Sequence, residues 1–144
     1  MKRQLLRHGF LFLFIALWLG LATATLSHPE KWLAGHVTAL LTGVVLVVIG
    51  LAWTELTLTA RQRAFAFWCG LISAYTGLVS NIFTALVDLP GPASNPGVNP
   101  TGVPAVIFFA LLLILIPTIL TSFGLVLYGT RGERRADTAH TFAD

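Results

Sequence analysis

Four apolar stretches, each about as long as a bilayer is thick, dominate the sequence. They cover about 9–26, 33–53, 64–87 and 104–128. A membrane-spanning helix needs about 20 mostly apolar residues, and no stretch shows the alternating polarity of barrel strands. The sequence therefore predicts an all-α membrane protein, a four-helix transmembrane bundle. Residues 1–130 form its single domain, and 131–144 form a polar cytoplasmic tail.

Composition supports the same class. The chain is 56% apolar and 10% charged, whereas soluble domains have about 25% charged residues. This excludes a disordered chain, a nucleic-acid-binding module and an ordinary water-soluble domain. The single cysteine, Cys69, excludes a disulfide framework and a cysteine-rich metal site. The expected solvent is the lipid bilayer.

The cations predict the orientation of the spans. Eight of the nine lie on one side: Lys2, Arg3 and Arg7 before the first span, Arg61 and Arg63 before the third, and Arg131, Arg134 and Arg135 after the fourth. Only Lys31 lies opposite. Because cytoplasmic loops are enriched in Lys and Arg, we expect both termini in the cytoplasm. The high pI then reflects topology and not an anionic ligand.

The first 24 residues also resemble a secretory signal. They have a basic start, an apolar stretch and Ala22-Thr23-Ala24 as a cleavage-site pattern. The apolar run is longer than the usual signal core of about 7–15 residues. We therefore expect the segment to be retained as the first span.

The third span carries a stripe of small and polar residues. At about 100° per residue they fall on one arc about 140° wide: Ser73, Thr76, Gly77, Ser80, Asn81, Thr84 and Asp88. Such a stripe either packs helices closely or faces a functional cavity. Asn81 is the most informative member, because an amide in mid-span demands several partners.

The second span places His36 beside a ridge of small residues. Gly35, Ala39 and Gly43 recur every four residues, which lets another backbone or a flat ligand approach closely. A neutral imidazole here can accept a proton, bind a metal or hydrogen-bond to a neighbour. From the residues alone, these alternatives stay open.

Other features restrict the chemistry less. His8 lies near the inner end of the first span, too far from His36 to share a metal, and His28 can approach His36 only through a folded loop. No HExxH motif, Cys/His cluster or carboxylate pair is present.

The Leu89–Val103 loop is rich in Pro, Gly and Asn, so it is either a packed cap or a tolerated surface loop.

Several positions together resemble one family. They are Arg7-His8-Gly9-Phe10 at the first span, His36 with Gly43 seven residues later, the Tyr75 region, Asn81 and the outer loop. In order and spacing the chain resembles the hydroxylaminobenzene mutase and styrene oxide isomerase group of small bacterial membrane isomerases. The resemblance covers about residues 7–130.

This resemblance implies a multi-pass protein of the bacterial inner membrane, a homotrimer that binds haem b. It implies His36 as the iron ligand, with Gly35, Ala39 and Gly43 against the cofactor. Thr42, Ser73, Thr76 and Asn81 are then the expected substrate-binding residues, and Asn81 and Tyr75 the expected catalytic ones. Tyr75 either donates to the substrate oxygen or simply packs, because it lies opposite the stripe.

The implied chemistry is an isomerisation of a small aromatic substrate. Haem iron with one protein ligand leaves a coordination position open and acts as a Lewis acid on an aryl epoxide or an arylhydroxylamine. Hydride migration gives an aldehyde, and oxygen relocation gives an aminophenol. Family members often have Asn-Gly where this chain has Thr42-Gly43. The epoxide isomerase has Tyr at the position where this chain has Asn81. These departures leave the substrate undecided.

Two other functions remain compatible with the sequence. One is a non-catalytic b-type cytochrome, in which His28 supplies a second axial ligand. The other is a haem-free bundle whose polar stripe forms an oligomer interface or a path for small solutes.

Overall fold

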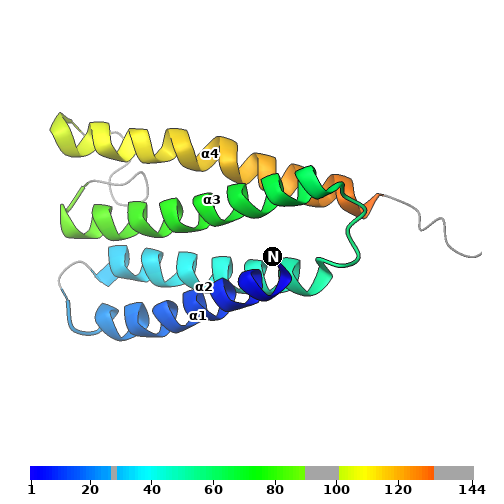
Figure 1. Ribbon diagram of the computed structural model, residues 1–144. Helices are drawn as coiled ribbons and strands as arrows, with labels where there is room; N and C mark the ends of the chain where they lie inside the picture. The colour runs from blue at the N-terminus through cyan, green and yellow to red at the C-terminus, as the bar shows by residue number, and fades with distance from the viewer. Residues whose placement is uncertain (27–28, 90–100, 132–144) are drawn as a thin grey trace, which may run out of the picture.

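The computed structural model consists of four long helices (Figure 1). It describes residues 1–26, 29–89 and 101–131. The helices are α1 (Lys2–Thr23), α2 (Pro29–Ala52), α3 (Ala60–Leu86) and α4 (Gly102–Thr130). All four are long and apolar enough to cross a membrane. The predicted all-helical, four-span architecture is confirmed, and the chain is a multi-pass membrane protein.

Three expectations lie outside the described residues. They concern His28, most of the Leu89–Val103 loop and the tail that follows Arg131.

α1, α2 and α3 each begin before the matching apolar stretch, because their first turns contain charged residues that lower the local hydropathy. In α1, helical structure starts at Lys2 and includes the basic residues that precede the first apolar run. Before α3, Thr59 forms a capping box: its hydroxyl accepts from the Gln62 amide at 3.3 Å, and the Gln62 side chain accepts from the Thr59 amide at 3.0 Å. This reciprocal pairing satisfies backbone donors that a helix start leaves free.

The chain forms two helical hairpins that lie side by side. α1 packs on α2, α3 packs on α4, and α2 meets α3 between them (Figure 1). The α1–α2 contact is close because glycines face each other: a Cβ at Gly43 would lie 2.9 Å from the Gly9 carbonyl oxygen. Small residues permit this approach between membrane helices. In contrast, α4 exposes most of its apolar surface, as expected for a helix that faces lipid or another subunit.

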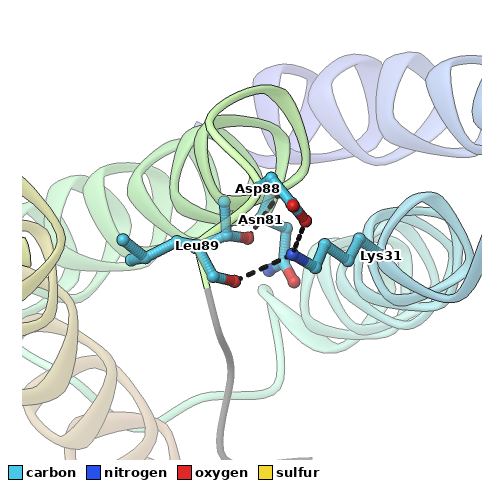
Figure 2. A network of polar contacts seen from close by, with 5 residues as sticks. Lys31, Asn81, Asp88 and Leu89 are labelled. Carbon is cyan, nitrogen blue, oxygen red and sulfur yellow. Dashed lines mark hydrogen bonds and ion pairs between the residues drawn. The ribbon is translucent and has the colours of Figure 1, made fainter. Parts of the chain in front are cut away.

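Both ends of the bundle are tied by polar contacts. At one end, the amide and hydroxyl of Thr57 donate to the Gly129 carbonyl at 2.9 and 2.8 Å, and Arg63 Nη2 donates to the Leu56 carbonyl at 2.7 Å. At the other end, Lys31 reaches from α2 to the residues that follow α3 (Figure 2). The Lys31 contacts join the two hairpins, whereas the contacts of Thr57 and Arg63 hold the α2–α3 connection against α4 and α3.

Candidate functional site

A cavity of about 380 Å³ lies between α2, α3 and α4. Its walls are mostly aliphatic and aromatic, with a few polar groups. The polar side chains that line it are Thr38, Thr42, Ser73, Asn81 and Ser122. Three of them, Thr42, Ser73 and Asn81, belong to the set predicted to bind substrate. The structure therefore brings these three together around one cavity.

Two of the polar side chains are used for packing. Ser73 Oγ donates to the carbonyl of Gly70 at 3.0 Å, within α3. Ser122 Oγ donates to the carbonyl of Ala66 at 3.0 Å and so ties α4 to α3. Ser122 and Thr38 complete the polar lining and were not in the predicted set. A search for small polar residues at helical spacing along the second and fourth spans would have found them.

The remaining polar groups keep hydrogen-bonding capacity. Asn81 Nδ2 donates to the carbonyl of Gly77 at 2.9 Å. Within the described part of the chain, Asn81 Oδ1 and the hydroxyls of Thr38 and Thr42 have no hydrogen-bond partner. Each of these atoms remains partly accessible to solvent. Small-molecule sites are typically apolar cavities with a few converging polar groups, and this cavity has that composition.

His36 is held in one orientation by α1. Its Nδ1 lies 2.7 Å from the carbonyl oxygen of Ala16. A carbonyl can only accept, so Nδ1 carries the proton, and a neutral ring then has its lone pair on Nε2. The ring also lies against Gly20, where a Cβ would be 3.1 Å from Nδ1. Such an Nδ1–H contact to a carbonyl is how proteins orient a histidine that binds metal through Nε2.

His36 and the cavity lie on different sides of α2. Thr42 follows His36 by six positions, which places the two residues about 120° apart around the helix. Thr42 lines the cavity, whereas His36 contacts α1 and is not among the lining residues of the described chain. The predicted metal ligand and the predicted substrate residues are thus not brought together within one subunit.

The predicted small-residue ridge is buried against neighbouring helices. Gly43 faces Gly9 and Leu13 of α1, and Gly35 lies between Leu19 of α1 and Asn81 of α3. Ala39 is fully buried. This placement accounts for the ridge as a helix contact, and its part in cofactor binding stays a prediction.

Tyr75 and Thr76 face a different cavity. It measures about 570 Å³ and lies between α1 and α3. Tyr75 Oη is 2.7 Å from Nδ1 of His8 on α1. This pairing of His8 with Tyr75 was not predicted from the sequence. The available signal was that both are polar side chains in spans, and that Tyr75 lies off the stripe and so needs another partner.

Few side chains near His36 could bind a metal. Among the described residues, no three His, Cys, Asp or Glu side chains gather closely enough to bind an ion. Within these described residues, His36 could supply one protein ligand to a metal, and its part in metal binding stays a prediction.

The comparisons with known proteins cover all four helices. The sequence profile of the styrene oxide isomerase family matches residues 1–131. The chain belongs to the styrene oxide isomerase family. It is also similar to hydroxylaminobenzene mutase HabB of Ectopseudomonas oleovorans, with 24% identity over 134 residues, 91% of this chain and 82% of that protein. No solved structure matches the chain.

Membership of the styrene oxide isomerase family confirms the resemblance inferred from the sequence. The matched range, residues 1–131, contains His36, Thr42, Tyr75 and Asn81 and spans α1 to α4. The family and the relative both carry names of isomerase or mutase activities, so the chain is of the isomerase or mutase kind.

Proposed function

We propose that the chain is a membrane isomerase that uses haem b to rearrange a small aromatic substrate. The substrate is an arylhydroxylamine, converted to an aminophenol, or an aryl epoxide, converted to an aldehyde. The observation that carries this proposal is the orientation of His36, whose Nδ1 is fixed by Ala16. Family membership supports the reaction class.

The residues around His36 fit a haem ligand. The Ala16 carbonyl fixes the protonated nitrogen, so Nε2 is the atom left to bind a metal. The ring is partly buried, and Gly20 leaves room for it against α1. A haem bound through His36 would supply a ferric Lewis acid for the rearrangement.

The cavity between α2, α3 and α4 would hold and orient the substrate. Its volume of about 380 Å³ lies within the range of small-molecule sites and accommodates one aromatic ring with a short substituent. The Thr42 hydroxyl donates to the substrate oxygen, and Asn81 Oδ1 accepts from an N–H or O–H group. Ser73 forms part of the wall. The apolar remainder keeps water from trapping a cationic intermediate.

We further propose that the complete site forms between subunits of a homotrimer in the bacterial inner membrane. Within one subunit, His36 and the cavity lie on different sides of α2. A neighbouring copy that packs against the α1–α2 side can present its own cavity to His36. The cation distribution supports an orientation with both termini in the cytoplasm.

We assign the substrate contacts of this site to Thr42, Ser73 and Asn81. Tyr75 and Thr76 line the other cavity, so a direct part for them in the rearrangement requires that the substrate or a second subunit reach that side. Their predicted roles stay predictions.

The proposal is tested on the full chain purified in detergent. We expect a Soret band and a high-spin ferric spectrum that changes when azide is added. We also expect conversion of phenylhydroxylamine or styrene oxide without a nicotinamide or an external reductant. A sharp low-spin spectrum that azide does not change indicates a cytochrome with two axial ligands. A colourless and inactive protein indicates a haem-free bundle. Either result contradicts the proposal.

A further inference from the structure

We propose that the cavity between α1 and α3 is a second binding site, for a small neutral aromatic molecule that carries a hydroxyl or hydroxylamine group. The hydrogen-bonded pair of His8 and Tyr75 would recognise that group. This site does not require haem and lies apart from the cavity that holds Thr42 and Asn81.

The pair is rigidly placed. Tyr75 Oη and His8 Nδ1 are 2.7 Å apart, and the two rings meet edge to face with their centroids 5.7 Å apart. Phe12 packs on Tyr75 from α1 at a centroid distance of 5.1 Å. Two neighbours on α1 therefore fix the phenol ring, and a ligand would meet a preorganised polar group.

The pair retains hydrogen-bonding capacity that points to a ligand. His8 Nδ1 is used by Tyr75, but among the described residues no partner is present for His8 Nε2, the Gln4 amide or the Thr76 hydroxyl. His8, Gln4 and Thr76 line the same cavity. His8 lies six residues after the start of α1, or about 9 Å along its axis. Because this is the inner end of the first span, where water competes for these groups, a ligand hydroxyl would bind by replacing that water.

The apolar part of the cavity suits an aromatic ring. Phe67 is 4% exposed and Trp68 is 59% exposed, so one ring belongs to the packed wall and the other remains accessible. Both line the cavity together with Tyr75. Aromatic side chains favour offset or edge-to-face contact with a further ring. A neutral ligand is favoured over a charged one, because a charge is costly in an apolar site.

The two cavities can be tested separately. Tyr75 and Gly77 are two residues apart, or about 200° around α3, and they line different cavities. The polar recognition groups also come from different helices, namely α1 for His8 and α2 for Thr42. Variants at His8 therefore change this site and leave the lining of the other cavity unaltered.

The experiment measures binding of 4-fluorophenol to the full chain in detergent by fluorine NMR line broadening, with empty micelles subtracted. Fluorobenzene serves as the probe without a hydroxyl group. We expect His8→Phe to weaken 4-fluorophenol binding about tenfold, the effect of losing one hydrogen bond, and to leave fluorobenzene unchanged. His8→Gln should restore part of the affinity, because the amide can donate and accept. Thr118→Val is the matched control, since Thr118 lines neither cavity and bonds within α4.

Three results would overturn the proposal. The first is equal 4-fluorophenol affinity in the unaltered chain and in His8→Phe, with circular dichroism showing that the variant is folded. The second is an equal loss for both probes, which indicates only a change of apolar packing. The third is that 4-fluorophenol binding does not depend on His8 because a second copy of the chain fills the cavity. That outcome would be detected as an oligomer that dissociates in the His8→Phe variant. The binding measurement stands whether or not the protein isomerises a substrate, so it is separate from the test of the proposed function.

Discussion

His36 on α2 and Ala16 on α1 are joined by a hydrogen bond of 2.7 Å between Nδ1 and the carbonyl oxygen. The two residues are twenty positions apart in the sequence, and they meet because the α1–α2 hairpin is closely packed at its glycines. The contact determines which imidazole nitrogen carries the proton. It thereby connects the packing of the first hairpin to the chemistry proposed for the site.

The first prediction concerns this histidine. His36→Ala removes Nε2, so the purified variant should lose its Soret band, whereas His8→Ala should keep it. Gly20→Ala should retain the ligand but crowd the ring, because the new Cβ would lie 3.1 Å from Nδ1. We expect its haem affinity to fall by about tenfold, as for other changes that disturb the orientation of a metal ligand. Equal haem content in His36→Ala and His8→Ala would refute the assignment.

The second prediction concerns Asn81. Asn81→Ala should keep the haem but lower isomerase turnover about 3- to 10-fold, the effect of losing one neutral hydrogen bond to the substrate. Thr84→Val is the matched control on the same helix, since Thr84 bonds to the Asn81 carbonyl and does not line the cavity. Steady-state rates on phenylhydroxylamine and styrene oxide provide the measurement. Unchanged turnover on both substrates would exclude Asn81 from the site.

The sequence predicted the architecture well, because the bilayer imposes simple rules. A helix that crosses it must be long and apolar, and the four stretches satisfy this condition. The helix starts were less predictable. Lys2 and the polar turn after Thr59 are helical through local backbone and capping contacts, which hydropathy does not register.

The site was predicted only in part, because helical spacing gives a face but not its partner. Helical spacing correctly placed Ser73 and Asn81 on the same side of α3. It also assigned Thr76 to that side, although Thr76 lines the opposite cavity with Tyr75. The pairing of His8 with Tyr75 joins two residues far apart in the chain, and no spacing rule within one helix reveals it.

The third prediction concerns the helix contact at Gly43. A methyl group there would lie 2.9 Å from the Gly9 carbonyl oxygen and from Leu13 Cγ, so the two helices must separate. We expect Gly43→Ala to reduce the free energy of unfolding by about 1–3 kcal/mol, the usual cost of overpacking. Gly124→Ala is the control, because nothing lies within 4 Å of its added Cβ. It should be neutral or stabilise the helix by up to about 1 kcal/mol.

Thermal unfolding in detergent, followed by circular dichroism, compares these two glycine variants. If Gly43→Ala unfolds at the same temperature as Gly124→Ala, the α1–α2 contact is looser than the structure describes.

The last prediction concerns the ion pair between Lys31 and Asp88. Lys31 Nζ lies 2.5 Å from Asp88 Oδ1 and donates to the Leu89 carbonyl at 3.0 Å (Figure 2). The lysine side chain is 12% exposed, but Asp88 is 61% exposed, so solvent screens the pair. We therefore expect Asp88→Asn to lower the free energy of unfolding by less than about 1 kcal/mol.

A double-mutant cycle isolates this pair from the other contacts of Asp88. In the Lys31→Met background, Asp88→Asn should have a smaller effect than in the unaltered chain, because the cation is absent. The difference should also shrink as salt is raised to about 1 M, where the screening length falls to about 3 Å. An effect of Asp88→Asn that is independent of both Lys31 and salt would show that the carboxylate stabilises the end of α3 through its other contacts and not through the pair.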